Sequence, residues 1–361
     1  MRRILWFCAV YLCLFCLGSC GMGGSADNAR GSDGKVENLS GAGATFPLPF
    51  YQLAFKEYAK AGGVQVSYGA IVSGGGIRSL KDRVVDFGAT DAFLSDEELA
   101  DFGEEVLHIP TCMGAVVLAY NLEGVEGLRM TPKIVADMYL GNITKWNDVA
   151  IAEVNPGVKL PDLPITLVYR SDGSGTTSVF SHYMASVSDT WESVLGEGKA
   201  LQWPYGVAAK GNPGVAGILG QTPGAFGYVG SEYAFAMGLP FVALRNAAGQ
   251  YVLPTPEAIR AAAKVAMPAD TRTMITNSPE PDAYPICCLT WIVLYREQNY
   301  GGRTLEQAHA TQELLGWLLG DEAQALTEAV HYVRLPDPVV EIARAQLARC
   351  TYGGETLAGL K

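Results

Sequence analysis

Along this chain, segments with helically spaced apolar residues alternate with shorter segments that have the pattern of strands. Apolar residues at i, i+4 and i+7 predict a helix at 47–61, and apolar–polar alternation predicts a strand at 64–68. Continuous apolar runs at 115–120 and 286–295 predict buried strands. The same rules predict helices near 77–84, 132–140, 179–187, 214–219, 254–266, 305–319 and 339–348, and strands near 85–89, 165–169 and 224–229. The alternation favours an α/β fold.

The two buried strands bracket a middle stretch with its own succession of helices and strands. With 361 residues, of which 49% are apolar, the chain can form two domains with substantial cores. A buried strand at each end of the middle stretch is the pattern expected where a chain crosses twice between two lobes.

Residues 1–20 are predicted to be an export signal. A basic pair at 2–3 precedes an apolar stretch at 4–17, which is shorter than the roughly 20 residues needed to cross a bilayer. The boundary Leu-Gly-Ser-Cys resembles a bacterial lipobox, so Cys20 is expected to become the lipid-modified first residue. An ordinary signal peptide and an uncleaved anchor are the alternatives. Residues 21–38, rich in Gly, Ser, Asp and Asn, are predicted to be a flexible tether.

Charge and cysteine spacing narrow the classes of partner. The net charge of −11 disfavours nucleic acid. No metal or other cofactor is expected, because the four histidines are scattered and no C-x-x-C pair is present. Four cysteines lie outside the leader, and export would permit disulfides between them. They are expected to be buried free thiols, with a bridge from Cys112 to Cys287 or Cys288 as the alternative; the fourth is Cys350.

Three glycine- and hydroxyl-rich segments each come just before a helical pattern. A helix N-terminus carries unpaired N–H groups and a partial positive charge, and it therefore attracts anions. Glycine lets the backbone approach a ligand closely. Three such ends that converge would form a cage for a small oxyanion. The segments are Gly41-Ala42-Gly43-Ala44-Thr45-Phe46, Ser73-Gly74-Gly75-Gly76 and Asp172-Gly173-Ser174-Gly175-Thr176-Thr177.

Arg170 would supply the full positive charge of this cage, and Asp172 would hold its guanidinium in place. Arginine suits tetrahedral oxyanions because its planar fork donates hydrogen bonds in pairs. A local turn ion pair without a ligand is the alternative. Ser174 and Thr176 combine hydroxyls with backbone N–H groups, although either could simply cap the helix.

The other two segments contribute further candidates. Thr45 has the same two interpretations, as a helix cap or as a donor to a ligand. Ser73 precedes three glycines, whose entropy cost is hard to explain by structure alone. Asp91 follows the predicted strand at 85–89 and is a carboxylate expected near the anion. An exposed loop residue is the alternative for Asp91.

The known nucleotide and hydrolase motifs fit these segments poorly. The first segment begins like G-x-G-x-x-G, but it ends in Phe46 and is expected to precede the first strand, which disfavours a dinucleotide site. The third segment lacks the lysine of a P-loop. Ser174 has no nearby histidine base and no G-x-S-x-G frame. No enzyme activity is therefore expected.

Five motifs occur in order along the chain: 41–47 (Gly-Ala-Gly-Ala-Thr-Phe-Pro), 86–91 (Asp-Phe-Gly-Ala-Thr-Asp), 139–148 (Tyr-Leu-Gly-Asn-Ile-Thr-Lys-Trp-Asn-Asp), 170–176 (Arg-Ser-Asp-Gly-Ser-Gly-Thr) and 224–229 (Gly-Ala-Phe-Gly-Tyr-Val). With these motifs the chain resembles the bacterial periplasmic phosphate-binding proteins, the substrate-binding components of high-affinity phosphate ABC transporters. The resemblance runs from 39 to about 338. The second glycine-rich segment of this chain reads Ser-Gly-Gly-Gly, where two serines are common in the family.

The resemblance implies a type II periplasmic-binding-protein fold, in which two α/β lobes joined by a hinge close over the ligand. Lobe one is expected at 36–120 plus 284–361 and lobe two at 121–283. The implied phosphate contacts are Ala44, Thr45, Phe46, Ser73, Asp91, Arg170, Ser174, Gly175 and Thr176, with Asp172 in support.

The implied function is that a monomer anchored outside the cytoplasmic membrane through Cys20 binds inorganic phosphate and delivers it to the membrane permease subunits of an ABC importer. A binding protein for another oxyanion, such as sulfate or molybdate, is one alternative. A secreted phosphatase is the other.

Overall fold

A single mixed β-sheet of eight strands runs through the protein, in the order β2-β1-β3-β11-β4-β8-β6-β7. The computed structural model describes residues 36–360, so the predicted signal and Cys20 lie outside the described residues, as does the tether up to residue 35. The strands are β1 (Asn38–Gly43), β2 (Gln65–Gly69), β3 (Phe87–Thr90), β4 (Val106–Tyr120), β6 (Thr166–Arg170), β7 (Val207–Ala209), β8 (Ala225–Gly230) and β11 (Cys287–Tyr295).

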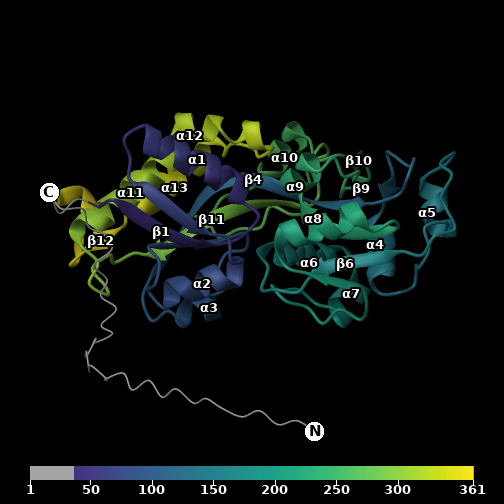
Figure 1. Cartoon of the computed structure of the whole chain (residues 1–361), viewed down its shortest axis with the longest axis horizontal. Coiled ribbons are helices and arrows are strands. Elements are labelled where there is room, and N and C mark those ends of the chain that lie inside the picture. The colour runs from purple at the N-terminus through teal and green to yellow at the C-terminus, as the bar shows by residue number, and fades with distance from the viewer. Residues whose placement is uncertain (1–35, 361) are drawn as a thin grey trace, which may run out of the picture.

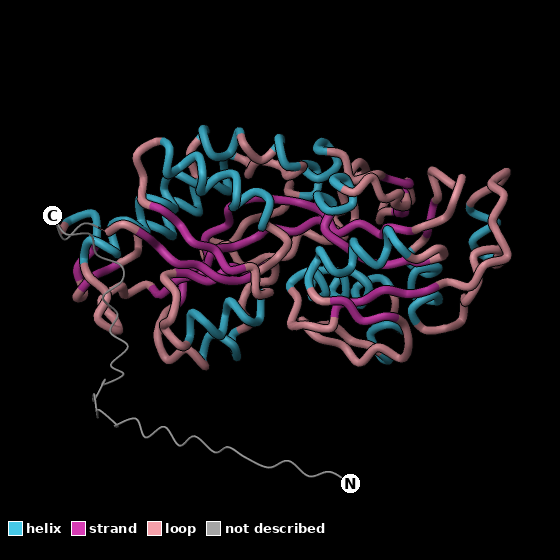
Figure 2. Tube along the Cα trace, in the orientation of Figure 1, coloured by secondary structure: helices cyan, strands magenta, loops and turns pink. Residues whose placement is uncertain are grey.

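Helices cover both faces of this sheet (Figure 1). One face at the β1 end carries α1 (Leu48–Lys60), α11 (Leu305–Leu318), α12 (Asp321–Ala325) and α13 (Asp337–Leu347), and the opposite face carries α2 (Ser73–Lys81) and α3 (Asp96–Ala100). The other half holds α4 (Pro132–Tyr139), α5 (Val149–Val154), α6 (Gly175–Val187), α7 (Asp189–Val194), α8 (Gly211–Gln221), α9 (Ser231–Ala236) and α10 (Pro256–Ala262). Figure 2 shows the strands in the interior between these helices. Strands covered on both faces explain the continuous apolar runs in the sequence.

Smaller elements complete the described chain. A three-stranded sheet contains β5 (Arg129–Met130), β9 (Ala243–Arg245) and β10 (Tyr251–Val252), and β12 (Thr351–Tyr352) pairs with β13 (Glu355–Thr356). Short 3-10 helices lie at Glu328–Val330 and Leu357–Gly359. None of the helices between residues 36 and 360 is long and apolar enough to span a membrane.

The long strand β4 joins the two halves of the sheet. Its residues from Val106 to Ala115 pair with β11, and those from Val116 to Tyr120 pair with β8. The sequence predicted only the second part as a strand. The first part contains His108, Pro110 and Thr111, which interrupt the apolar run.

The fold accommodates these three residues individually. Pro110 lies where the β4–β11 register shifts, a position that tolerates the missing N–H. His108 Nε2 accepts the Leu94 N–H at 3.1 Å, and Thr111 Oγ1 donates to the Thr290 carbonyl at 3.2 Å. Burial lowers the pKa of His108 to about 3, so the imidazole is neutral.

The contacts of residues 268–275 bear on the predicted lobe boundary. This stretch belongs to the predicted second lobe, yet Thr271 Oγ1 donates to the His108 carbonyl at 2.8 Å, and the Trp291 indole donates to the Thr271 carbonyl at 3.1 Å. His108 and Trp291 lie on β4 and β11. The boundary between the lobes therefore stays a prediction.

The first glycine-rich segment is partly a strand, so the expectation that it precedes the first strand was wrong. Gly41 and Gly43 lie in β1, which pairs with β2 and β3 in parallel. A Cβ at Gly41 would lie 2.1 Å from the Phe87 ring, and one at Gly43 would lie 2.1 Å from the Ala89 carbonyl oxygen. The glycines serve close packing inside the sheet, and this is why the strand lacks an apolar pattern.

The second segment also lies inside an element, because Ser73 to Gly76 form the first turn of α2. A Cβ at Gly76 would lie 2.4 Å from the Ala42 carbonyl oxygen. The glycine run therefore lets α2 lie directly against β1, which is a structural reason for these residues that the sequence did not reveal.

The four cysteines outside the leader are buried and free. On β4 and β11, Cys112 lies opposite Thr290 and Cys287 opposite Ala115, so the alternative bridge is not formed. Burial raises the pKa of Cys112, Cys287 and Cys350 well above the ordinary thiol value. These residues act as small apolar side chains.

Gly76→Ala should destabilise the protein by about 1–3 kcal/mol, because the added methyl forces α2 away from β1. Gly217→Ala is the matched control, since Gly217 also lies within a helix but a Cβ there meets nothing within 4 Å. The free energy of unfolding of that control should rise by about 0.5–1 kcal/mol, because alanine lowers the conformational entropy of the unfolded chain. Urea unfolding of both variants measures the difference, and an unaltered Gly76→Ala would contradict the packing argument.

Candidate anion-binding site

The third predicted segment forms a buried turn between β6 and α6. The Arg170 side chain, at the end of β6, is only 2% exposed and forms an ion pair with Asp172. Arg170 Nε donates to Asp172 Oδ1 at 2.9 Å, and Nη2 donates to Oδ2. A buried guanidinium needs such a partner. The pair holds the guanidinium plane in one orientation.

The hydroxyl of Thr176 receives hydrogen bonds from two directions. Arg170 Nη1 donates to Thr176 Oγ1 at 3.3 Å, and Asn212 Nδ2 donates to the same oxygen at 3.2 Å. Ser174 does cap α6, because its Oγ accepts the Thr177 N–H at 3.0 Å. The two hydroxyls, which the sequence could not distinguish, therefore have different partners.

Asn212, at the start of α8, connects the first and third segments. Its backbone N–H and its Nδ2 donate to Thr45 Oγ1 at 3.1 and 3.3 Å, and its Oδ1 accepts the Gly230 N–H at 3.0 Å. Sequence reasoning missed this residue, because the helix predicted there began at 214. The run Gly-Asn-Pro-Gly at 211–214 was the available signal, since these residue types favour a turn or a helix start.

Thr45 does not cap α1. The N-cap is Pro47 without a side-chain cap, whereas the Thr45 hydroxyl accepts from Asn212. The backbone of this segment is also fixed, because the Ala44 N–H donates to the Ala89 carbonyl at 2.9 Å. Phe46 is fully buried, with its ring 5.9 Å from that of Tyr332.

The second segment meets the third directly. Ser73 Oγ accepts the Gly175 N–H at 3.1 Å, and the Gly74 N–H donates to the Gly173 carbonyl at 2.9 Å. A Cβ at Gly175 would lie 2.6 Å from Ser73 Oγ and 2.8 Å from the Asp91 nitrogen. Only glycine fits at position 175, and its close approach brings Asp91 to the same place.

Asp91 is buried, and not an exposed loop residue, with 1% of its surface accessible. Its Oδ1 accepts from Thr290 Oγ1 at 3.0 Å. Burial raises the pKa of Asp91 to about 7, although the Thr290 hydrogen bond and the Arg170 charge work against this shift. Burial also raises the pKa of Glu232, a nearby carboxyl that sequence reasoning missed, well above its usual range. The site therefore carries less negative charge than its carboxyl groups suggest.

The structure thus gathers most of the predicted residues in one buried place. Thr45, Ser73, Asp91, Arg170, Asp172, Gly175 and Thr176 are connected by the contacts above, with Ala44 and Phe46 beside Thr45 and Ser174 capping α6. A fixed guanidinium, hydroxyls and helix N-termini beside the Asp91 carboxyl form an arrangement that can hold an anion able to donate a hydrogen bond.

A salt bridge lies at the edge of this site and spans the two halves. Lys199 Nζ lies 2.6 Å from Glu98 Oε2 on α3, and the Ser174 N–H donates to the Lys199 carbonyl at 2.8 Å. The Lys199 and Glu98 side chains are 20% and 35% exposed. The pair therefore connects the loop after α7, which contains Lys199, to α3.

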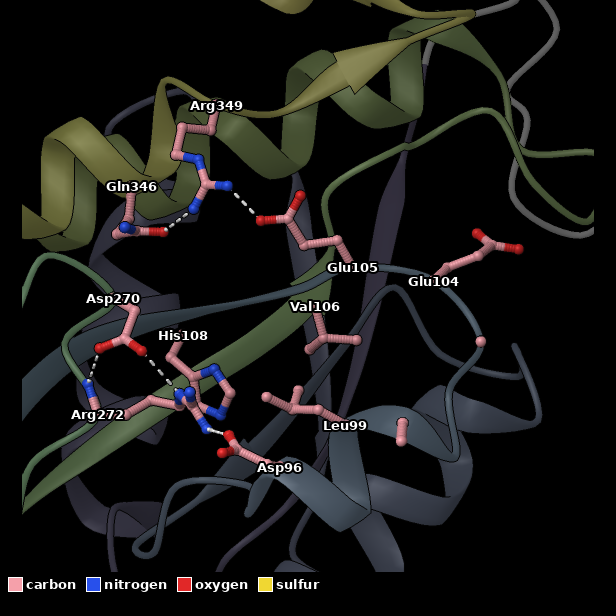
Figure 3. A pocket seen from close by; sticks show the side chains of 12 residues that line it. Asp96, Leu99, Glu104, Glu105, Val106, His108, Asp270, Arg272, Gln346 and Arg349 are labelled. Atoms are coloured by element: carbon pink, nitrogen blue, oxygen red, sulfur yellow. Dashed lines mark hydrogen bonds and ion pairs between the residues drawn. The ribbon is translucent and has the colours of Figure 1, made fainter.

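A separate pocket of about 550 Å³ lies beside α3 and α13, and none of the predicted site residues lines it. Figure 3 shows the side chains that line this pocket. Its arginines are already paired: Arg272 with Asp96 and Asp270, and Arg349 with Glu105. These arginines therefore present no unpaired charge to a ligand. Separately, the described residues contain no group of three side chains that could ligate a metal ion.

Comparison with known proteins defines the class. A model of the PBP superfamily domain matches residues 28–322. The phosphate-binding protein PstS of Xylella fastidiosa (strain Temecula1) is 40% identical over 319 residues, which cover 87% of this chain and 86% of that protein. The chain therefore belongs to the PBP superfamily and, within it, to the PstS family of substrate-binding proteins.

Solved structures share the fold at low sequence identity. A periplasmic phosphate-binding protein crystallised with phosphate superposes with a TM-score of 0.66 at 20% identity, covering 85% of this chain and 93% of that chain. An ABC-type phosphate transport receptor from Vibrio cholerae gives a TM-score of 0.54 at 17% identity, covering 82% of this chain and 100% of that chain. The expected type II periplasmic-binding-protein fold is confirmed.

The Asp91 carboxyl should make the stability of the ligand-free protein depend on pH. Its pKa is about 7 in the fold against an ordinary 3.8, so the folded state keeps a proton that the unfolded chain releases between these values. Stability from this group is therefore lost as pH rises from about 4 to about 7.

Asp91→Asn cannot titrate and should remove this contribution. Between pH 4 and 7, its free energy of unfolding should rise relative to wild type by on the order of a few kcal/mol. Urea unfolding of both proteins gives this difference, which cancels the contributions of other groups such as His108. A difference that does not vary with pH would contradict the buried, proton-holding Asp91.

Proposed function

We propose that the protein binds inorganic phosphate outside the cytoplasmic membrane and delivers it to the permease subunits of an ABC importer. The observation that carries this proposal is the buried Arg170 guanidinium, fixed by Asp172, at the same place as the buried Asp91 carboxyl. The 40% identity to a protein named phosphate-binding protein supports it.

The proposed contacts divide into donors and one acceptor. Arg170, the hydroxyls of Thr45, Ser73, Ser174 and Thr176, and the N–H groups of Phe46 and Gly175 donate to the anion, with Ala44 beside them. The Gly175 N–H, which donates to Ser73 Oγ in this structure, exchanges that partner for the anion. Hydrogen bonds to charged groups contribute about 1.5–3 kcal/mol each. Such a site binds phosphate without its water shell.

Asp91 sets the choice of anion in this proposal. An ionised carboxylate only accepts hydrogen bonds, and phosphate near neutral pH keeps a proton that it can donate. Sulfate has no such proton, so its oxygens would face those of Asp91. Like charges placed together cost on the order of several kcal/mol, which disfavours sulfate.

The enzyme alternative lacks support in the described part of the chain. The Ser174 hydroxyl caps α6, and the described residues hold no three-ligand metal group. A nucleophile–base pair or a metal is what phosphatase chemistry would need. The PstS relatives are named as binding proteins and not as enzymes. Another oxyanion remains the competing ligand, and Asp91 distinguishes it.

Delivery requires that the protein open and close. The site draws Thr45, Ser73 and Asp91 from segments after β1 and around β3, and Arg170 and Thr176 from the turn between β6 and α6. One small anion is contacted by all of them only when the two halves meet, so phosphate stabilises the closed form through its differential affinity. A monomer suffices for this cycle.

Export and anchoring complete the proposed function. The basic and apolar leader and the Leu-Gly-Ser-Cys boundary support a chain that is lipid-modified at Cys20 and held at the membrane surface. The tether predicted at 21–38, whose last residue Asn38 belongs to β1 in the fold, would then let the folded part reach the permease.

The test of the proposal is titration of phosphate and sulfate at pH 8, where Asp91 is ionised, followed by intrinsic tryptophan fluorescence. The wild-type protein should bind phosphate and discriminate against sulfate by about a hundredfold or more. Asp91→Asn should keep useful phosphate binding and narrow that gap, because an amide can donate to sulfate.

Repeating both titrations at pH 6 adds a second comparison. The preference of the wild type for phosphate over sulfate should be smaller at pH 6, because Asp91 gains a proton. Asp91→Asn cannot titrate at this position, so its titrations show any change that is due to the protonation of phosphate itself. Absence of phosphate binding by the wild type would refute the function, and an equal phosphate-to-sulfate ratio in the two proteins would refute the role of Asp91.

The Lys199–Glu98 salt bridge should favour the closed form. Lys199→Gln should weaken phosphate binding by up to about fivefold, the range for a partly exposed pair, and the effect should shrink at high salt. Glu98→Gln should do the same, and glutamine can still serve the capping box with Ser95.

The exchanged pair Lys199→Glu with Glu98→Lys should recover much of the affinity. Lys133→Gln is the control, because Lys133 pairs with Asp137 within α4 and does not connect the two halves. Equal salt dependence in wild type, single variants and control would show that the bridge does not contribute to closure.

A further inference from the structure

Three successive carbonyl groups of the first segment each accept a hydrogen bond from a different tyrosine hydroxyl. Tyr68 donates to the Ala44 carbonyl at 2.8 Å, Tyr233 donates to the Thr45 carbonyl at 2.6 Å, and Tyr332 donates to the Phe46 carbonyl. The Thr45 carbonyl also receives a longer bond, at 3.4 Å, from the Leu48 N–H.

These hydroxyls come from three separate parts of the chain. Tyr68 lies on β2, Tyr233 on α9, and Tyr332 follows the 3-10 helix Glu328–Val330. Three unrelated elements therefore converge on one stretch of backbone.

A peptide group is planar and trans, so its C=O and N–H point in opposite directions. A hydroxyl that holds the Ala44 carbonyl therefore also orients the N–H of Thr45, and one that holds the Thr45 carbonyl orients the N–H of Phe46. Among the described residues, no backbone or side-chain acceptor takes a hydrogen bond from either N–H. Two unpaired donors are thus held next to the hydroxyl of Thr45.

Tyr233 differs from the other two tyrosines in its surroundings. Its helix α9 packs on β8 and on β4, in the half of the sheet that holds Arg170, whereas Thr45 follows β1 at the other end. Its hydrogen bond therefore connects the two halves. It can form fully only when α9 and the Thr45 segment are together.

We propose that Tyr68 and Tyr233 are positioning residues that aim the N–H groups of Thr45 and Phe46 at the bound anion, and that Tyr233 couples this to closure. The inference rests on the proposed function, since the anion is taken to be phosphate. The Tyr233 hydroxyl, which comes from one half, thereby orients the Phe46 N–H, which belongs to the other half.

Tyr332 offers a control built into the same segment. The peptide group after Phe46 belongs to Pro47, which has no N–H. Tyr332→Phe therefore loses a hydroxyl–carbonyl bond of the same kind without misdirecting a donor. Tyr352→Phe, which loses a 3.1 Å bond to the Arg303 carbonyl, is a remote control.

The first measurement is the phosphate affinity of the four variants. Tyr68→Phe and Tyr233→Phe should raise the Kd by about threefold to tenfold, the range for one neutral hydrogen bond. Tyr332→Phe and Tyr352→Phe should change it by less than about twofold. Thermal unfolding of each ligand-free variant shows whether it is folded and how much stability it has lost.

The second measurement is the amide ¹H–¹⁵N spectrum with and without phosphate. In wild type, the Thr45 and Phe46 amide protons should move downfield when phosphate binds. Tyr233→Phe should reduce the shift of Phe46 and preserve that of Thr45, and Tyr68→Phe should do the reverse. A purely structural role would not separate these two signals.

The outcomes separate this inference from the proposed function. If wild type fails to bind phosphate, the proposed function itself fails. If wild type binds and Tyr68→Phe and Tyr233→Phe match it in affinity and amide shifts, the positioning role is overturned. An affinity loss in Tyr332→Phe equal to that in Tyr233→Phe would also overturn it, since the bond would then serve only stability.

Discussion

The ion pair between Arg170 and Asp172 is the interaction on which the arrangement of the site depends. A guanidinium that is 2% exposed is costly unless it is paired, and Asp172 pairs with it through two contacts. The same carboxylate accepts the Gly211 N–H at 2.9 Å and so fixes the start of α8. The next residue, Asn212, then reaches both Thr45 and Thr176. One buried pair thus organises a guanidinium, a helix start and two hydroxyls.

The long strand β4 places the parts of the site on either side of one shared element. Because β4 pairs with β11 along its first part and with β8 along its second, the two halves share one continuous backbone. The segments that carry Thr45 and Ser73 lie on one side of this crossing, and those that carry Arg170 and Asn212 lie on the other. Contacts such as Gly175 to Ser73 and Tyr233 to Thr45 therefore report how closely the halves approach.

Burial gives the site its electrostatic character. Asp91 is a carboxyl whose pKa is raised to about 7 by burial, and Glu232 is a second buried carboxyl whose pKa is also raised. Arg170 is neutralised by Asp172. In the proposed site, hydroxyls and oriented N–H groups are then donors beside the paired guanidinium, and they act locally whatever the net charge of −11 on the whole chain.

Local pattern was sufficient for much of the fold. The helical spacing after Pro47 and the apolar runs at 115–120 and 286–295 predicted α1, the second part of β4 and β11 closely, because these elements bury one stripe or both faces. The motifs around Arg170 and Thr45 also identified the candidate residues. Glycines, hydroxyl groups and an arginine close together in the chain already indicate anion binding, whatever the rest of the fold is. The helix predicted at 254–266 is shorter in the fold, ending at Ala262.

Packing between distant segments determined the rest. Only the position of Phe87 and Ala89 explains why β1 is a strand made largely of small residues, and only the approach of α2 to β1 explains Gly76. The sequence could name Thr45 and Thr176 but not Asn212, whose hydrogen bonds connect the two. Asn212 lies 167 positions from Thr45 and 36 positions from Thr176 in the chain. It could not show that Ser174 caps α6 while Thr176 faces Arg170, nor that tyrosines on three elements hold one loop. Local chemistry is encoded by neighbours in the chain, whereas burial, shared hydrogen bonds and shifted pKa values arise from neighbours in space.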